Sequence, residues 1–158
     1  MTPLSDDIAT ARPDLGLAVR QSIYDGFLAE GRSLSAAEIA GRLGTGVGEV
    51  RQELKKLAQA HALVLQAESG EVLMANPFSA VPTALPVTSQ GRSWWGNCIW
   101  DALGILAMVG ADGDVATACP DCGEALSLSI RAGTLSGGPA IAHFFVPVRS
   151  WWEDIVFT

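Results

Sequence analysis

The chain has 158 residues, of which 49% are hydrophobic and 17% are charged, and its formal net charge is −7. This composition excludes a disordered chain, and the length suffices for one domain or two small ones. No apolar run approaches the ~20 residues that a membrane span needs, and the N-terminus lacks a signal-peptide pattern, so we expect a cytoplasmic protein with no membrane partner.

The first part of the chain is predicted to be a tail followed by a helix. Residues 1–14 are polar, contain two prolines, and are expected to form a flexible tail. From Leu15 to Glu30, apolar side chains recur every three or four positions, which is typical of an amphipathic helix. Gly31 then supplies a stop signal.

Two further helices and a hairpin are predicted next. Ser35 and Glu38 have the spacing of a capping box, which opens a short helix through Leu43. A second helix is expected from about Val47 to His61. The apolar runs within residues 64–75, separated by Ser69 and Gly70, indicate a small hairpin.

This order of elements predicts a winged-helix-like domain over residues 15–76. Such a domain raises the hypothesis of DNA binding, with Arg51, Lys55 and Lys56 on the recognition helix. Acidic residues flank these three, however, and from Gln66 onward there are three basic residues against nine acidic ones. The charge therefore disfavours a nucleic-acid partner, and we favour a helical module that packs on the second domain.

Residues 77–91 contain three prolines among small side chains and are predicted to be an extended linker between domains. The second domain is expected over residues 92–158. Alternating apolar residues predict strands at 115–118, at 126–130 and from about 140 to 146. A turn or short helix is expected after Pro147. These pieces predict an α+β fold, in which a small sheet carries one packed helix.

That helix is predicted over residues 94–109, WWGNCIWDALGILAMV, and carries the main candidate for chemistry. Cys98 and Asp101 are three residues apart, which places a thiol and a carboxyl on one helix face. Apolar neighbours would exclude water and shift both pKa values. The alternatives are that Cys98 only packs, and that Asp101 faces solvent or caps the helix start. The expected pocket residues are Trp94, Trp95 and Trp100.

The segment CPDCG, with Cys119 and Cys122, is the second candidate. Two thiolates are half of a tetrahedral zinc site, and no second CxxC pair exists, which argues against zinc. The pair could instead be redox active, bind a soft metal, or form a tight turn without chemistry. His143 is read as a packed strand histidine and not as a ligand.

Three stretches together resemble a known family. GNCIWDALGILA, TACPDCGEALSLSI and HFFVPVRSWWEDIVFT are similar to the catalytic domain of the alkylmercury lyase (organomercurial lyase) family over residues 92–158. The preceding helical module is similar to the family's N-terminal domain. The resemblance implies that Cys98 is a thiolate that attacks the mercury of R–Hg⁺ and that Asp101 relays the proton to the departing carbon. It implies a structural role for Cys119 and assigns none to Cys122.

The sequence departs from the family pattern in one respect. In the family a second catalytic Cys follows the segment matching WWEDIVFT, and here no Cys follows Cys122. Either the chain is shortened, so that its second domain is incomplete, or it is a relative that lost the full mechanism. Cys119, Cys122 or a small-molecule thiol could supply the second thiolate.

Three functions are therefore carried forward. The first is carbon–mercury protonolysis, with Cys98 and Asp101 catalytic, mercury as substrate and product ion, and no cofactor. Its expected partners are a small organometallic substrate and either small-molecule thiols or a mercury-accepting protein. The second is a mercury- or zinc-binding or sensing module without turnover, whose metal ligands are Cys98, Cys119 and Cys122. The third is a winged-helix transcriptional regulator, which the charge disfavours.

Overall fold

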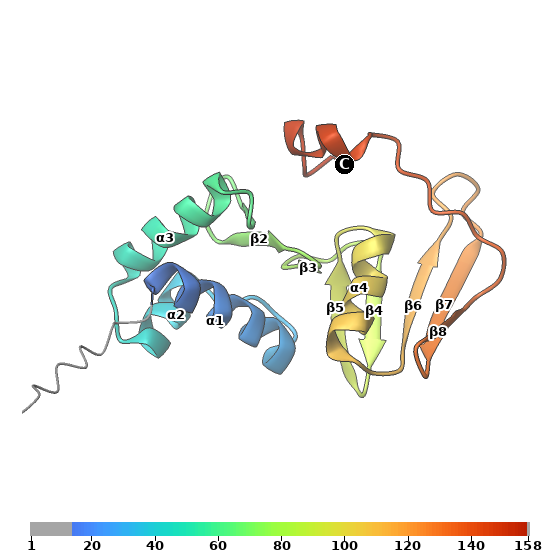
Figure 1. Ribbon diagram of the computed structural model, residues 1–158, viewed down its shortest axis with the longest axis horizontal. Helices are drawn as coiled ribbons and strands as arrows, with labels where there is room; N and C mark the ends of the chain where they lie inside the picture. Colours follow the sequence, from blue (N-terminus) through green and yellow to red (C-terminus); the bar gives the residue numbers. More distant parts are fainter. Residues whose placement is uncertain (1–13, 158) are drawn as a thin grey trace, which may run out of the picture.

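The structure is a computed structural model that describes residues 14–157. Three helices form one end of the molecule, and an eight-stranded antiparallel sheet extends from them to the other end, with a fourth helix packed on its central strands (Figure 1). The fold is α+β, as predicted. Apart from Asp14, the predicted tail lies outside the described residues. No helix within residues 14–157 combines the length and the apolar character needed to cross a membrane.

The three N-terminal helices begin and end at the signals that the sequence carries. The helix α1 (Leu15–Glu30) ends at Gly31, whose φ of 72° is left-handed and suits glycine. The helix α2 (Ala36–Leu43) begins with the predicted capping box, since the Ser35 side chain accepts from the Glu38 N–H and the Glu38 carboxylate accepts from the Ser35 N–H. The helix α3 (Val47–Gln59) follows it after a short turn.

The strands form a single sheet in the order β1-β2-β3-β5-β4-β6-β7-β8, in which every neighbouring pair is antiparallel. The helix α4 (Ile99–Val109) packs on one face of the central strands (Figure 1). A 3₁₀ helix, η1 (Val148–Glu153), lies near the C-terminus. The strand bounds are β1 (Val64–Leu65), β2 (Val72–Ala75), β3 (Phe78–Ser79), β4 (Pro86–Ser89), β5 (Arg92–Gly96), β6 (Gly113–Ala118), β7 (Ala125–Arg131) and β8 (Thr134–Ser136).

One hydrophobic core continues from the helices into the sheet. The rings of Phe27 on α1 and Phe78 on β3 stack with centroids 4.8 Å apart. The indole Nε1 of Trp94 on β5 donates to the Phe27 carbonyl oxygen at 2.7 Å, which satisfies a buried donor. Arg92 donates to the carbonyl of Leu28. The C-terminal end of α1 is therefore tied to the strand that leads into α4.

Residues 77–91, predicted to be a linker, instead contain β3 and β4. These strands join the hairpin β1–β2 to the strands around α4, so the sheet runs through the predicted boundary. The prolines misled the prediction because Pro86 is the first residue of β4, a position where a missing N–H is tolerated.

The predicted helix at 94–109 begins five residues later than expected, at Ile99, because Trp94 and Trp95 belong to β5. Aromatic side chains favour the half-buried surface of a sheet, and Trp94 packs in the core there. The remaining eleven residues form α4, and Gly110 ends the helix in a left-handed conformation.

The strand predicted from 140 to 146 is absent from the described residues. This segment leaves the sheet after β8 and runs back over the molecule toward η1 (Figure 1). Without a neighbouring strand its backbone forms no ladder, and the side chains of Ile141 and Phe145 are 94% and 85% exposed. The short helix predicted after Pro147 is confirmed as η1.

Candidate active site

The candidate active site lies where β5 ends and α4 begins. Gly96 closes β5, and a Cβ atom there would lie 2.7 Å from the Ala102 backbone nitrogen and 2.8 Å from its Cα. Only a residue without a side chain therefore allows the strand to approach the first turn of α4 so closely. Thr83 holds this end of the strand by donating from Oγ1 to the Gly96 carbonyl at 2.7 Å.

Cys98 is the N-cap residue of α4, in an extended conformation. Its Sγ accepts a hydrogen bond from the backbone N–H of Asp101 at 3.4 Å, and its carbonyl accepts from Ala102 at 2.9 Å. The sulfur thus occupies the position at which a polar side-chain oxygen usually caps a helix. Cys98 and Asp101, predicted to share a face, do lie together in the first turn, and both are partly buried.

Burial raises the pKa of the Cys98 thiol, and the nearby Asp101 carboxylate raises it further. The backbone N–H groups of Asp101 and Trp100 act in the opposite direction because they stabilise a thiolate. The pKa of Asp101 is also raised, and again burial is the main cause. The predicted shift of both acidities by a water-poor environment is consistent with these directions.

The thiol and the carboxylate also act on each other. Asp101 raises the pKa of Cys98, and the Cys98 thiol lowers that of Asp101, as expected for a thiol that lies close to a carboxylate able to accept its proton. A pair of this kind can pass one proton from thiol to carboxylate when an electrophile binds the sulfur.

Asn97, a residue that sequence reasoning missed, connects the pair to the helical part of the molecule. A side-chain hydrogen bond from Asn97 lowers the pKa of Asp101 and so opposes the effect of burial. Its Nδ2 also lies 3.0 Å from Oδ1 of Asn76, whose carbonyl accepts from Tyr24 of α1. The buried Oδ1 of Asn97 has no hydrogen-bond partner among the described residues. The only sequence signal that could have pointed to Asn97 is its position between the end of a strand and the N-cap residue of a helix.

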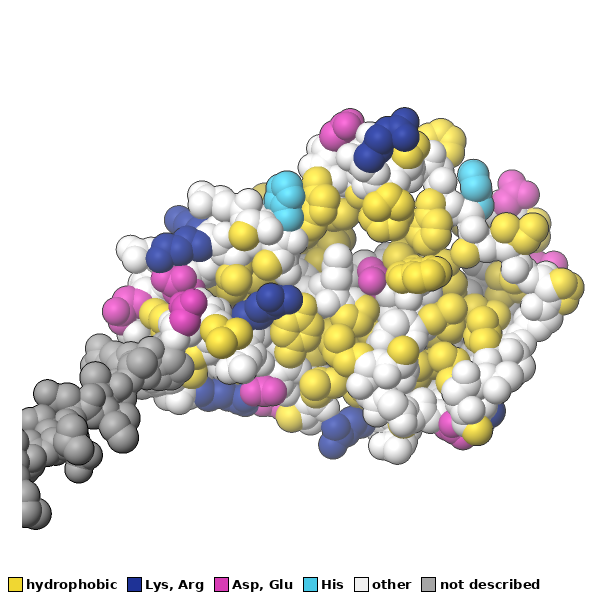
Figure 2. All heavy atoms as spheres, viewed as in Figure 1, with side chains coloured by type: hydrophobic (Ala, Val, Ile, Leu, Met, Phe, Trp, Pro, Cys, Tyr) yellow, Lys and Arg dark blue, Asp and Glu magenta, His cyan; other side chains and the backbone are white. Residues whose placement is uncertain are grey.

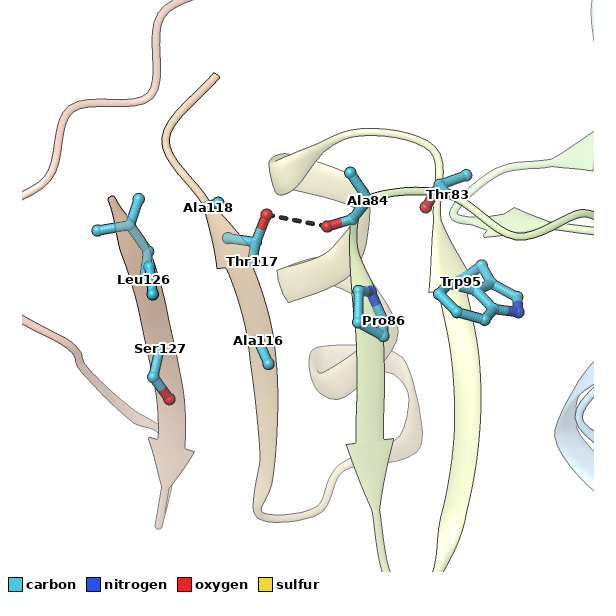
Figure 3. A pocket seen from close by; sticks show the side chains of 10 residues that line it. Thr83, Ala84, Pro86, Trp95, Ala116, Thr117, Ala118, Leu126 and Ser127 are labelled. Carbon is cyan, nitrogen blue, oxygen red and sulfur yellow. Dashed lines mark hydrogen bonds between the residues drawn. The ribbon is translucent and has the colours of Figure 1, made fainter. Parts of the chain in front are cut away.

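The three tryptophans predicted to form one pocket do not do so in this structure. Trp94 and Trp95 are successive residues of β5 and point to opposite faces of the sheet, Trp94 into the core. Trp95 lines a shallow apolar pocket on the face away from α4, together with Pro86 and Ala116 (Figure 3). Trp100, on the outer side of α4, is 72% exposed.

The Cys119–Cys122 segment forms the tip of the hairpin between β6 and β7. The N–H of Cys119 donates to the Glu124 carbonyl at 2.8 Å, and the N–H of Gly123 donates to the Cys119 carbonyl at 2.9 Å, which closes a tight turn. Hydrogen bonds from the backbone of Cys122 and Asp121 and from the Cys122 thiol lower the pKa of Cys119. Cys122 is exposed.

The predicted metal ligands Cys98, Cys119 and Cys122 are not brought together. Within residues 14–157, no three His, Cys, Asp or Glu side chains form a group that could hold a metal ion. His61 is engaged elsewhere, since its ring stacks on Trp152 of η1 at 4.1 Å.

A hollow separates the segment leading to η1 from the body of the molecule, and hydrophobic side chains gather around it (Figure 2). The N-terminal end of α4 is directed toward this hollow (Figure 1). The stacking of His61 on Trp152 attaches η1 to the helical part. The start of α4, which carries the thiol–carboxyl pair, therefore faces this apolar hollow.

The α+β fold has a counterpart among solved structures. The structure is similar to that of the mercury-bound form of MerB2, with a TM-score of 0.61 and 22% sequence identity. The match covers 81% of this chain and 61% of that one, so this chain spans about three fifths of the length of that relative. This likeness shows a shared fold. None of the curated proteins matches the chain significantly.

The family follows from the sequence itself. The sequence profile of the alkylmercury lyase family matches residues 78–158, which is just over half of the chain. The chain therefore belongs to the alkylmercury lyase family, and the resemblance inferred from its motifs is confirmed. The matched region begins at β3 and includes α4 and the hairpin tip with Cys119 and Cys122.

Proposed function

We propose that the protein cleaves carbon–mercury bonds by protonolysis, with Cys98 as the nucleophile and Asp101 as the proton carrier. The observation that carries this proposal is the placement of the Cys98 thiol and the Asp101 carboxyl together at the start of α4, in a partly buried site. Family membership supports the reaction class. The residue roles are those implied by the resemblance of the CIWD segment.

The reaction divides into two balanced steps. In the first, the Cys98 sulfur bonds to the mercury of R–Hg⁺ while its proton moves to the Asp101 carboxylate. In the second, the carbon–mercury bond breaks, its electron pair takes the proton from Asp101, and R–H departs. Mercury remains as Cys98–S–Hg⁺, which a second thiolate can then ligate, because soft thiolates are the preferred ligands of such a cation.

The raised pKa values suit this sequence. A raised pKa keeps the proton on Asp101 at higher pH once it has been received, so the carboxyl is a competent acid. The raised pKa of Cys98 keeps the resting thiol protonated, which preserves the proton that the reaction consumes. Mercury binding then displaces this proton because the sulfur–mercury bond is far stronger than the interaction with a proton.

The proposal also includes a role for the N-terminal helical module and a cellular location. We assign residues 15–76 to a winged-helix-like module whose role is to position the site through Tyr24 and Asn76, and not to bind DNA. Its hydrogen bonds to β5 support that role. A cytoplasmic location would supply the small-molecule thiols, or a mercury-accepting protein, that remove the product ion.

Benzene release from phenylmercury tests the proposal. The purified protein is incubated with phenylmercury in a buffer containing a monothiol, and benzene is measured over several turnovers. We expect Cys98→Ser and Asp101→Asn each to lower the rate by roughly 10²-fold or more. The matched control is Asp25→Asn, an exposed carboxylate on α1, which should react as the wild type does.

Two results would count against a lyase. Stoichiometric mercury binding through Cys98 without benzene would identify the soft-metal binding module instead. Benzene release that survives both substitutions would remove Cys98 and Asp101 from the reaction.

A further inference from the structure

The turn of residues 119–123, here called the knuckle, holds two cysteines that the proposed reaction does not use. Its two backbone hydrogen bonds fix the chain on both sides of Cys119, and Gly123 adopts a φ of 74° that favours glycine. Both cysteines therefore lie in a hydrogen-bonded turn at the tip of the hairpin. Pre-organisation of this kind lowers the cost of holding two ligands at one cation.

The surroundings of the Cys119 sulfur favour a thiolate ligand. Its neighbours in the turn are the backbone N–H groups of Asp121 and Cys122 and the Cys122 thiol, all of which can donate to it. Donors of this kind compensate the negative charge of a metal-bound sulfur and orient it. Neither sulfur belongs to the hydrophobic core, because Cys122 is exposed and Cys119 is only partly buried.

The donor set selects the kind of cation. Among the described residues no third His, Cys, Asp or Glu joins these two sulfurs in a group that could hold a metal. Zinc, which takes four ligands, does not fit two donors. A soft cation that is satisfied by two thiolates in a near-linear array does fit, and Hg²⁺ is such a cation.

The topology places the knuckle at the same end of the sheet as Cys98. The strands β5 and β6 both pair antiparallel with β4, so they run in the same direction. Val87 of β4 pairs with Trp94 on one side and with Val115 on the other, which puts these two residues level in the sheet. Cys98 and Cys119 each follow four residues later, just beyond the ends of β5 and β6, and these two strands are separated by roughly 10 Å.

We propose that Cys119 and Cys122 form a second site, separate from Cys98, that binds Hg²⁺ through two thiolates and receives it after the carbon–mercury bond is cleaved. The binding itself is independent of the proposed function, whereas the transfer rests on it. In the transfer, Cys98–S–Hg⁺ and the two knuckle thiols give Cys98–SH, a bis-thiolate mercury complex and one released proton. No oxidant or reductant is needed.

Mercuric chloride is the probe for binding. Cys98→Ser protein is loaded with Hg²⁺, exposed to an excess of monothiol, and desalted, and the retained mercury is measured. We expect about one Hg²⁺ per chain, because two thiolates from one turn outcompete single thiols. Cys98→Ser/Cys122→Ser and Cys98→Ser/Cys119→Ser proteins should retain almost none. Asp25→Asn in the Cys98→Ser background is the matched control, since this exposed carboxylate on α1 is outside the knuckle and both thiols are kept.

Several results would overturn the site. Equal loss of mercury from Cys98→Ser and the double variants would show that the knuckle does not chelate. One mercury for every two chains would mean a site shared between copies. A disulfide between the two knuckle cysteines would also overturn the site. It would be recognised if neither thiol reacted with a thiol reagent before loading and both reacted after treatment with a reductant. A thermal unfolding curve for each variant separates these results from misfolding.

The transfer is tested on the wild type after phenylmercury turnover without added thiol. Mass spectrometry of alkylated peptides should find Cys98 reactive again, with Cys119 and Cys122 protected. Mercury found on Cys98 beside free knuckle thiols would contradict the transfer. Absence of benzene would contradict the proposed function alone, because the loading experiment with mercuric chloride does not depend on catalysis.

Discussion

The molecule holds two thiol regions at one end of its sheet, and they differ in nearly every physical respect. Cys98 is partly buried beside a carboxylate, and its pKa is raised mainly by burial. Cys119 lies on an exposed turn, where hydrogen bonds from Asp121 and Cys122 lower its pKa. One residue type is thus adapted to keep a proton in one place and to lose it in the other.

The burial of Cys98 depends on the close approach of β5 to the first turn of α4 at Gly96. We expect Gly96→Ala to displace the first turn of α4, because the added Cβ would lie within 2.9 Å of three Ala102 atoms. The expected loss is about 1–3 kcal/mol of unfolding free energy, together with most of the benzene release. Denaturant unfolding measures the first quantity.

Gly104→Ala is the control for that substitution. The added Cβ would meet only Pro77 at 3.7 Å, and alanine favours a helix interior, so a gain of about 0.5–1 kcal/mol is expected. Equal behaviour of the two variants would show that the approach of β5 to α4 is not tight.

The opposite pKa shifts predict opposite alkylation profiles. Iodoacetamide reacts with thiolates, so Cys119 should be alkylated at a lower pH than a free cysteine and Cys98 only at a higher pH. Peptide mass spectrometry across a pH series measures both profiles in one sample. Cys122→Ala should move the Cys119 profile to higher pH, because it removes the side-chain donor of Cys122. If Cys98 and Cys119 were alkylated over the same pH range, the inferred difference between their pKa values would be wrong.

Asp101→Asn should reduce the difference in thiol pKa between Cys98 and Cys119 without removing it. The substitution removes the negative charge and the carboxylate acceptor, both of which raise the Cys98 pKa, so the thiolate should form at lower pH than in the wild type. Burial, the largest cause, remains, and the pKa should stay above that of a free cysteine. The ultraviolet absorbance of the thiolate in Cys119→Ser/Cys122→Ser protein reports this titration.

The same substitution has a predictable effect on stability. Because the folded-state pKa of Asp101 is raised, its contribution to stability is present at low pH and is lost as the pH rises through the folded pKa. Asparagine does not ionise, so the variant should gain stability relative to the wild type above that pKa. Denaturant midpoints at acidic and neutral pH test the sign.

Asn97→Ala should have the smallest effect on the pair. Loss of its hydrogen bond, which lowers the pKa of Asp101, should move that pKa further upward, and the hydrogen bond to Asn76 is worth about 1 kcal/mol. A pH profile of benzene release would show the shift, and a purely structural role would lower the rate equally at every pH. Asn97→Asp is a companion variant, because a second carboxylate should raise the Asp101 pKa as well.

Short-range patterns in the sequence were sufficient to predict much of the fold. The capping box of Ser35 and Glu38 and the glycine after α1 fixed helix ends because both are short-range hydrogen-bonding rules. Helical spacing predicted the proximity of Cys98 and Asp101, which in the structure arises because Cys98 caps the helix whose first turn holds Asp101. The hairpin with CPDCG at its tip followed from the alternation on either side.

The features that sequence reasoning missed depend on contacts between distant residues. Trp94 belongs to a strand because its indole reaches the carbonyl of Phe27, 67 positions earlier. The link from Asn97 to Asn76 spans 21 positions and has no pattern of its own. The segment from 140 to 146 has the alternation of a strand but no neighbour to pair with, and pairing is what creates a strand.

The sheet that passes through residues 77–91 has a consequence for how the protein unfolds. The strand β3 pairs with β2 of the hairpin on one side and with β5 on the other, and the core packs across the same boundary. Melting of the helices would leave Trp94 without its acceptor and Phe78 without its stacking partner. The two halves should therefore lose structure in a single cooperative transition. A destabilising substitution in α1 should then lower the stability of the region that holds the thiol–carboxyl pair as much as a substitution next to the pair does.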